Sequence, residues 1–411
     1  MPASDPRFAD RPDRPRTRGR RRRRGLAPLL VALVAILLGV SAIGVVAFKM
    51  TRSDDRPQWR TAGVGTPSGS PEPSGESGSS QPADEPKRQV ISLSATGDIV
   101  TGNAPSRLPA QGGKGFFDSV RSALAADLVM GNLEQPLTDD TGTGKCPPGS
   151  TACFQFRAPP SYAQHLRDAG FELLNQANNH GYDYGAAGYK NTQQALERHG
   201  LHHTGARDQI TVVDVDGVKV AVVGFSSYAW NNDLTDIPAA SRLIERATTM
   251  ADLVVVQVHM GAEGSDKIHV KPGTEWFYGE NRGDPIRFSR AMIDAGADLI
   301  VGHGPHVLRA MEFYRGRLIA YSLGNFAGGG RMLNNSGRLG WGGVLKVSLA
   351  ADGTWVDGEF ISTYMNDAGK PTLDPRKRGL GLVRELSASD FSTSGARFSS
   401  DGKIRPPTAA E

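Results

Sequence analysis

Short apolar segments alternate with helical stretches along most of the chain, and this alternation limits the possible folds more than any other feature. The segments rich in Val, Ile and Leu are predicted strands: Val90–Ala95, Leu128–Gly131, Phe171–Gln176, Lys219–Gly224, Leu253–Val258, Leu299–Val301 and Leu318–Ser322. Helical spacing marks the stretches between several of them: Phe116–Ala126, Ser161–Ala169, Ala186–His199, Ala239–Met250 and Pro285–Ala295. Strands that are apolar throughout are typical of parallel sheets covered on both faces. The pattern predicts an α/β domain with a largely parallel core.

Two later segments have a different pattern, because apolar and polar residues alternate along Gly343–Leu349 and Trp355–Tyr364. Alternation of this kind predicts antiparallel strands with one face exposed to water. Residues 371–411 are polar, and we expect a poorly ordered C-terminal tail there. Residues 89–370 are therefore the predicted globular domain.

The N-terminal part of the chain predicts a membrane anchor. Residues 1–24 contain ten Arg, and the 24 residues of Gly25–Phe48 contain no charge. A helix of that length measures about 36 Å, enough to cross a hydrocarbon core of about 30 Å. The preceding Arg run predicts a single-pass protein of the cell membrane, with the basic tail 1–24 in the cytoplasm and everything after Phe48 outside. A cleaved signal peptide is the alternative, since the small residues Ser41-Ala42 would permit cleavage.

A flexible tether is expected between this anchor and the domain. Residues 61–86 contain five Gly, five Pro and six Ser. Such a composition cannot bury enough apolar area to fold, so residues 49–88 are a predicted disordered linker. The whole chain has a formal net charge of +4, and the Arg-rich first 24 residues account for more than this excess. The domain itself is near neutral, which argues against nucleic acid as its partner.

The two cysteines exclude a disulfide-dense scaffold and a zinc site made of cysteines alone. Cys146 and Cys153 lie close together in a loop rich in Pro and Gly. Outside the membrane a disulfide that closes this loop is expected. Two free thiols are the alternative, and nothing marks either residue as a catalytic thiol.

Side chains able to bind metal follow the predicted strands where each strand ends. In chain order they are Asp98, Asn132, Glu134, Asn178, Asn179, His180, His259, Glu263, His303, His306 and Asn325. Ligands of α/β folds bind beyond the carboxyl ends of the strands. We therefore expect these side chains to meet at one rim of the sheet.

Each of these residues also has a purely structural interpretation. Asp98 could cap a helix or form a turn, His180 could be a buried structural histidine, and Glu263 could be a loop carboxylate. His303 and His306 are the strongest pair, because two histidines three residues apart on a Gly/Pro loop can converge on one ion. The presence of all these side chains at the ends of the strands favours a metal site. Oxygen and nitrogen ligands without thiolates suit Mn, Fe, Zn or Mg, as one or two ions.

At such a site, two of the carboxylates and one histidine could each take more than one role. Asp98 or Glu134 could bridge two ions that act on a phosphoester. His259 could complete one ion site, or act as a general acid that Glu263 orients.

Residues about 90–330 resemble the CapA/PgsA family of capsule (poly-γ-glutamate) synthesis proteins, which is itself similar to the calcineurin-type metallophosphoesterases. The resembling segments, in chain order, are Thr96-Gly-Asp98, Gly131-Asn-Leu-Glu134, Phe156-Arg157, Ala177-Asn-Asn-His180, Asp183-Tyr-Gly185, Val258-His259-x-Gly261-x-Glu263, Asp294-Ala-Gly-Ala-Asp298, Gly302-His-x-Pro-His-Val307 and Tyr321-Ser-Leu-Gly-Asn-Phe326. The resemblance implies a metallophosphoesterase-like layered sandwich. It also implies a membrane-anchored extracytoplasmic hydrolase that acts with a divalent metal on a phosphoester or an anionic envelope polymer. Membrane components of a polyglutamate synthase are the implied partners. The alternative is a non-catalytic accessory that binds or guides such a polymer.

The resemblance also implies which residues line the site. We assign metal binding to Asp98, Glu134, Asn179, His259, His303 and His306, catalysis to His180, His259 and Glu263, and a site-lining position to Asn132, Asn178 and Asn325. The chain departs from the pattern at Asp98-Ile-Val, which lacks the Asp-x-His of full metallophosphoesterases, and at Met260 and Gly304, where the family usually has Trp and His. One ligand of a first metal must then be absent or supplied differently.

Overall fold

The computed structural model describes residues 89–147, 149–150 and 153–408. The predicted cytoplasmic tail, membrane anchor and linker lie outside these residues. Within the described part of the chain, no helix has both the length and the apolar character needed to span a membrane.

The first sheet has a parallel centre and an antiparallel edge. Its strands follow the order β17 (Pro371–Leu373), β16 (Trp355–Met365), β15 (Trp341–Ala350), β1 (Val90–Val100), β2 (Leu128–Leu133), β3 (Leu173–Asn175) and β4 (His202–Thr204), with β14 (Asn325–Gly328) also paired to β1. Strands β1 to β4 and β14 are parallel, whereas β15 to β17 are antiparallel.

The second sheet is built in the same way around four parallel strands. Its order is β12 (Met311–Tyr314), β13 (Arg317–Ala320), β11 (Leu299–His303), β8 (Leu253–His259), β6 (Val218–Ser226) and β5 (Thr211–Val215), with the short β7 (Asn232–Asp233) beside β6. Strands β13, β11, β8 and β6 are parallel, while β12 and β5 are antiparallel edges. Two short hairpins complete the strands: β9 (Trp276–Phe277) with β10 (Glu280–Asn281), and β18 (Arg397–Phe398) with β19 (Ile404–Arg405).

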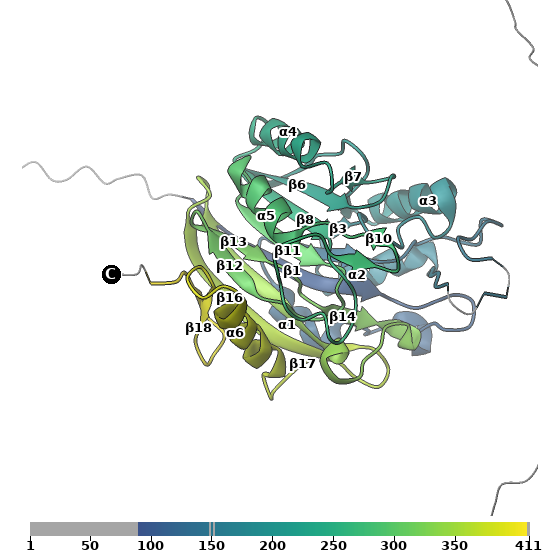
Figure 1. The fold of residues 1–411 in the computed structure, drawn as a ribbon. Helices are drawn as coiled ribbons and strands as arrows, with labels where there is room; N and C mark the ends of the chain where they lie inside the picture. Colours follow the sequence, from purple (N-terminus) through teal and green to yellow (C-terminus); the bar gives the residue numbers. More distant parts are fainter. Residues whose placement is uncertain (1–88, 148, 151–152, 409–411) are drawn as a thin grey trace, which may run out of the picture. The chain divides into compact units, whose positions relative to one another are not determined.

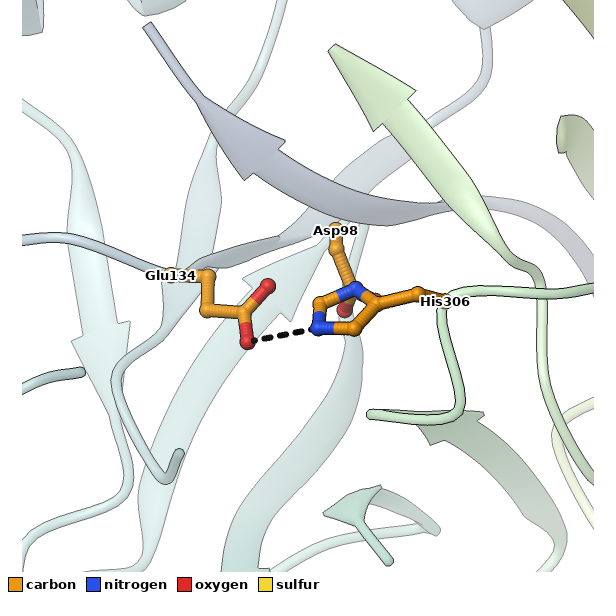
Figure 2. A group of neighbouring side chains, drawn as sticks. All are labelled: Asp98, Glu134 and His306. Atoms are coloured by element: carbon orange, nitrogen blue, oxygen red, sulfur yellow. Dashed lines mark ion pairs between the residues drawn. The ribbon is translucent and has the colours of Figure 1, made fainter. Parts of the chain in front are cut away.

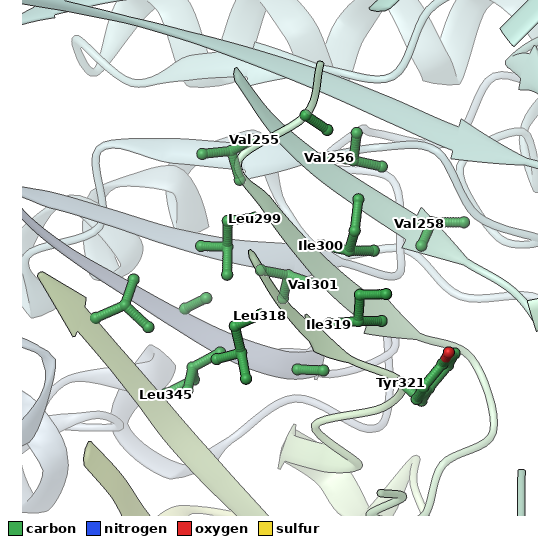
Figure 3. Close-up of a cluster of buried hydrophobic side chains, with 14 of the residues drawn as sticks. Val255, Val256, Val258, Leu299, Ile300, Val301, Leu318, Ile319, Tyr321 and Leu345 are labelled. Carbon is green, nitrogen blue, oxygen red and sulfur yellow. The ribbon is translucent and has the colours of Figure 1, made fainter. Parts of the chain in front are cut away.

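The two sheets pack face to face. One apolar cluster takes side chains from both, such as Leu345 of the first sheet and Val255 and Val301 of the second (Figure 3). Helices α4 (Ile237–Thr248) and α5 (Pro285–Asp294) cover the outer face of the second sheet (Figure 1). Helices α1 (Arg121–Leu124) and α2 (Ala163–Ala169) pack on the outer face of the first sheet, and α3 (Gly185–Arg198) adds Ala195 and Leu196 to their cluster. The predicted α/β layered sandwich is confirmed, although its strands divide into two mixed sheets.

The prediction of a poorly ordered C-terminal tail is wrong for the described residues. Helix α6 (Arg378–Asp390) follows β17 and buries Leu380, Val383 and Leu386 in the cluster between the sheets. The polar average of this segment hides an apolar stripe with helical spacing, and such a stripe is enough to dock a helix.

Strand β15 is also more buried than expected, because it lies between β1 and β16 and is covered on both faces.

The predicted disulfide is present. Cys146 and Cys153 are bonded, with their Cα atoms 5.6 Å apart. The bond closes the loop that follows β2 and leads towards α2.

One buried arginine holds the segment between β8 and α5. Arg309 is 1% exposed and donates from Nη1 and Nη2 to the Glu275 carboxylate at 2.8 and 2.9 Å. It also donates to the carbonyl oxygens of Lys267 and Ala262, at 2.7 and 3.1 Å. This single side chain therefore fixes several points of the long segment 260–284.

Replacing this arginine is expected to destabilise the domain strongly. Arg309→Met removes the cation paired with the Glu275 carboxylate, which keeps the Ala262 N–H as a donor, and it removes the donor to two carbonyl oxygens. We therefore expect unfolding in urea to show a loss of about 3–5 kcal/mol. Arg315→Met is the matched control, because Arg315 pairs with Asp294 at 3.0 Å on the surface. An exposed pair contributes less than about 1 kcal/mol. Equal losses in the two variants would contradict the anchoring role of Arg309.

Candidate metal centre

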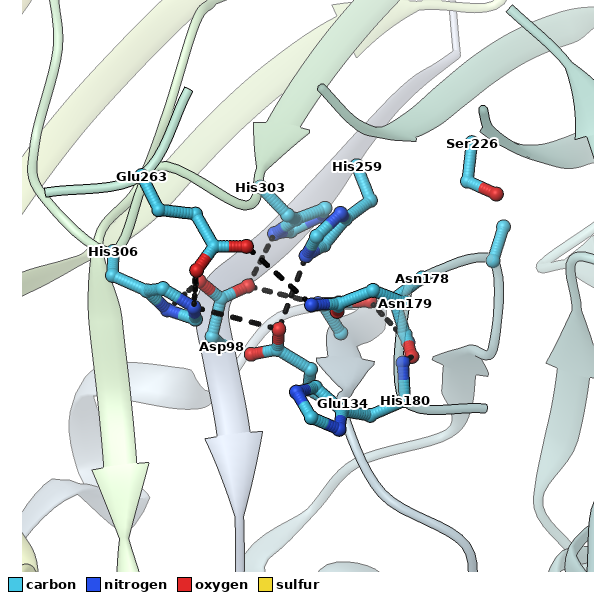
Figure 4. Close-up of polar contacts among 12 residues, drawn as sticks. Asp98, Glu134, Asn178, Asn179, His180, Ser226, His259, Glu263, His303 and His306 are labelled. Carbon is cyan, nitrogen blue, oxygen red and sulfur yellow. Dashed lines mark hydrogen bonds and ion pairs between the residues drawn. The ribbon is translucent and has the colours of Figure 1, made fainter. Parts of the chain in front are cut away.

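The strand register brings polar side chains together at one end of both sheets. In the first sheet, Asp98 of β1 lies opposite Asn132 of β2 and Asn325 of β14. In the second sheet, His303 of β11 lies opposite His259 of β8. Parallel strands end at the same edge, so the two rows of side chains face each other there (Figure 4).

A chain of amides fixes the first carboxylate. Asn132 donates from Nδ2 to Asp98 Oδ1 at 2.8 Å. Its own Oδ1 accepts from Asn175 Nδ2 at 3.0 Å and from Asn178 Nδ2 at 3.2 Å. Asn132 and Asn178 thus lie beside Asp98, and their amides are engaged in orienting it.

Three of the predicted metal ligands form a compact cluster. Asp98, Glu134 and His306 each offer one ligand atom, and these atoms lie within 4.8 Å of one another (Figure 2). His306 Nδ1 is 3.1 Å from Asp98 Oδ2, and His306 Nε2 is 3.6 Å from Glu134 Oε1. Both carboxylates are fully buried. The cluster is the arrangement expected for oxygen and nitrogen ligands of a divalent ion.

The backbone and Asn325 together aim the His306 ring. His306 has φ +60°, in the left-handed region that residues other than glycine seldom adopt. Its Nδ1 donates to Asn325 Oδ1 at 2.8 Å, and Asn325 Nδ2 donates to the carbonyl oxygen of Leu339 at 3.0 Å. A metal-binding histidine typically has one ring nitrogen engaged in this way, which leaves the other for the ion.

Unpaired buried atoms at the site fit a cation. Glu134 Oε2, Asn179 Oδ1 and His303 Nδ1 are buried and make no hydrogen bond to any other described residue. Buried polar atoms are normally paired, so each unpaired one needs an explanation. A divalent ion would satisfy a carboxylate oxygen, an amide oxygen and an imidazole nitrogen together. The residues present therefore fit a metal, and Asn179 and His303 each have an unpaired buried atom at the cluster.

Burial and mutual charge set the protonation of the cluster. Burial raises the pKa of Glu134 to about 8, and the nearby Asp98 charge adds to this while His306 opposes it. Burial also acts to raise the pKa of Asp98, but the hydrogen bond and charge of His306 outweigh it and hold that pKa below its usual value. The pKa of His306 is raised well above its usual value, because Glu134 and Asp98 outweigh burial. The protonated imidazole of His306 is thus favoured beside the two acidic groups.

The remaining two histidines are held neutral. Burial lowers the pKa of His303 to about 4. Burial and then the Arg282 charge lower the pKa of His259 to about 3. His259 Nε2 lies 3.1 Å from Glu134 Oε1, and His303 Nδ1 lies 3.9 Å from Asp98 Oδ1. A neutral imidazole is the form that binds metal, so both residues suit the ligand role predicted for them.

Glu263 reaches His259 through an arginine that the sequence did not reveal. Arg282 is 1% exposed, pairs with the Glu263 carboxylate, and places Nη1 3.4 Å from His259 Nδ1. The expected orientation of His259 by Glu263 is therefore indirect. A single arginine inside the segment 260–284 has no local pattern that would identify it.

The predicted catalytic His180 lies in its own polar pair beside the cluster. Its Nδ1 is 2.7 Å from Asp183 Oδ2, and Lys145 Nζ is 2.6 Å from Asp183 Oδ1. The His180 ring lies 4.3 Å from the Phe156 ring. Neither Asp183 nor Lys145 was assigned to the site, although Asp183 belongs to one of the resembling segments.

Gln257 was also not predicted as a site residue, although it is a lone polar residue in an apolar strand. Its Oε1 is 3.1 Å from His303 Nε2.

A cleft of about 1060 Å³ opens beside these residues. Its lining contains polar site residues, two cations and several aromatic rings: Lys145, Cys153, Phe154, Asn179, His180, Tyr228, Trp230, Glu263, Phe277, Tyr278, Glu280 and Arg282. The disulfide loop and the β9–β10 hairpin therefore both contribute to the cleft. Its size is suited to a ligand larger than a single phosphate.

The fold and the site define a layered α/β protein with a metal-type cluster where two sets of parallel strands end. Residues 92–329 match the family described as bacterial capsule synthesis protein PGA_cap. The match covers more than half of the chain, and the chain belongs to this family.

Curated relatives agree with this assignment. The "PGA biosynthesis protein CapA" of Bacillus subtilis is 34% identical over 257 residues, which are 58% of this chain and 63% of that protein. The "Capsule biosynthesis protein CapA" of Bacillus anthracis is 32% identical over 270 residues, 60% of this chain and 61% of that protein. The chain thus spans a little over three fifths of each relative.

A solved 5′-nucleotidase precursor from Thermus thermophilus has a TM-score of 0.40 and 13% identity, over 74% of this chain and 60% of that one. Likeness at this level carries no information about activity.

Removing the histidine of the cluster is expected to weaken metal binding. His306→Ala deletes one ligand and leaves two buried carboxylates facing each other, so we expect the affinity for Mn²⁺ to fall at least about tenfold. Isothermal titration of the purified full-length chain measures this loss. His202→Ala is the control, since His202 is exposed on β4. Equal Mn²⁺ affinity in the two variants would remove His306 from the ligand set.

Proposed function

We propose that this chain is a metal-dependent hydrolase that acts on a phosphoester or an anionic envelope polymer during capsule or poly-γ-glutamate synthesis. The observation that supports this most is the cluster of Asp98, Glu134 and His306, with unpaired buried ligand atoms around it. We further propose that residues 25–48 anchor the chain in the cell membrane, with the domain outside, next to membrane components of a polymer synthase.

Asp98, Glu134 and His306 would hold the ion, with Asn179, His259 and His303 as further ligands. A divalent ion bound there would supply positive charge to stabilise a phosphoryl oxygen on which negative charge develops. Mn, Zn, Fe or Mg fit the donor atoms, as one or two ions.

The chain's own residues would orient the substrate and move a proton. His180 donates from Nδ1 to Asp183, which leaves Nε2 as the nitrogen that can exchange a proton with the oxygen of a leaving group. His259 is held neutral by burial and the Arg282 charge, so it suits a ligand or a proton acceptor better than a proton donor. The walls of the cleft would limit the access of water to the reacting groups.

A non-catalytic accessory role is the second candidate. Val100, two residues after Asp98, is fully buried and supplies no ligand, although full metallophosphoesterases resembling this chain have a histidine at that place. One ion with an incomplete partner site would then serve to hold an anionic polymer in the cleft. Binding of poly-γ-glutamate without any turnover distinguishes this role from hydrolysis.

Hydrolysis can be tested directly on the full-length chain in detergent. We expect Mn²⁺-dependent cleavage of p-nitrophenyl phosphate or bis-p-nitrophenyl phosphate, abolished by EDTA and restored by Mn²⁺. Asp98→Ala should lower the rate on the order of 100-fold, because the buried ligand set loses a carboxylate. Asp118→Ala, which changes an exposed carboxylate paired with Arg121, should leave the rate unchanged. Bound metal without cleavage of either ester would favour the accessory role.

A further inference from the structure

Arg282 is a buried cation that lies over two aromatic rings. Its Cζ lies 5.7 Å from the centre of the Tyr228 ring and 5.6 Å from the centre of the Phe277 ring. The Tyr228 ring in turn stacks on Trp230, with centres 5.0 Å apart and planes 17° apart. Cation–π contacts of this kind hold a guanidinium in place while its N–H groups still donate hydrogen bonds.

The N–H groups of Arg282 contact site residues, and at least one of them has no hydrogen-bond partner in the described structure. Nη2 pairs with the Glu263 carboxylate, and Nη1 is 3.4 Å from His259 Nδ1. Nε is 3.4 Å from Glu280 Oε2 but makes no hydrogen bond within the described structure. A guanidinium carries five N–H donors and keeps its charge at all relevant pH values. Arg282 therefore has more donors than its present partners use.

The Glu263 carboxylate lies between this arginine and the metal cluster. Besides Arg282, its Oε1 is 3.4 Å from Asn179 Nδ2, and its Oε2 is 3.6 Å from His306 Nε2. Glu263 keeps some exposure and lines the cleft together with Arg282. Its carboxylate thus occupies a position that attracts an anion from two sides and that a ligand in the cleft can reach.

We propose that Arg282 is the anion-binding residue of the cleft, and that the Glu263 carboxylate holds this position until an anionic oxygen of the ligand displaces it. The ligand group is a phosphoryl or a carboxylate group, since the fork of a guanidinium matches the oxygen spacing of both. Lys145 provides a second cation on the same cleft, paired with Asp183. The proposal rests on the proposed function in taking this cleft as the substrate site.

Anion binding without metal tests this assignment. The full-length chain in detergent, stripped of metal with EDTA, is titrated with inorganic phosphate and separately with glutarate by isothermal titration calorimetry. We expect Arg282→Met to weaken binding of the preferred anion at least tenfold. We expect Glu263→Gln to strengthen it at least threefold, because the competing carboxylate is gone. Tighter binding of phosphate assigns a phosphoryl group to the position, and tighter binding of glutarate assigns a carboxylate.

Arg315→Met is the matched control for the loss of a stacked arginine. Arg315 also lies over an aromatic ring, that of Tyr314 at 5.6 Å, and pairs with Asp294, away from the cleft. The Arg315→Met variant should bind the anion as tightly as the unchanged protein does.

The Glu263→Gln variant decides the question if Arg282→Met does not fold, as judged by circular dichroism, because it alters one atom of a partly exposed side chain. Unchanged or weaker anion binding in Glu263→Gln would overturn the proposal. Because no metal and no turnover are involved, failure of the hydrolase assignment would show separately in the ester assay.

Discussion

Two acidic side chains, Asp98 and Glu134, are buried side by side at the ends of β1 and β2, and the cost of burying them determines the rest of the site. Desolvating an ion costs several kcal/mol unless opposite charge and hydrogen bonds offset it. His306 supplies part of the offset, at 3.1 Å from Asp98, and its own unusual backbone is held through Asn325. Asn132 supplies a further donor to Asp98. Unpaired atoms of Glu134, Asn179 and His303 remain around the cluster, and a divalent cation would satisfy them all.

The sequence predicted that these side chains lie together because each follows an apolar strand, and parallel strands end at one edge. The proximity of Asp98, Glu134, His259, His303 and His306 could be predicted in this way, and their role as ligands stays a prediction. The division of the strands into two sheets could not, since pairing between β1 and β15 or between β11 and β8 joins residues far apart in the chain. Arg282 was missed for a related reason. It reaches the site only because the segment that carries it folds back over the end of β8.

That segment links stability to the site. Arg309 and Glu275 fix the stretch 260–284 through a buried pair and two bonds to backbone carbonyls. The same stretch carries Glu263 and Arg282 to the mouth of the cleft.

Helix α6 was missed because the C-terminal stretch that forms it is polar on average, although the spacing of Leu380, Val383 and Leu386 is helical. It lies beyond the residues that match the family, yet it closes the core shared by the two sheets.

The most direct measurement of the metal site is an anomalous difference map from crystals of the protein grown with Mn²⁺. The cluster predicts a peak bounded by the carboxylates of Asp98 and Glu134 and the imidazole of His306. A map with no anomalous peak among these three side chains, at a Mn²⁺ concentration that saturates the protein in solution, would contradict a metal centre there.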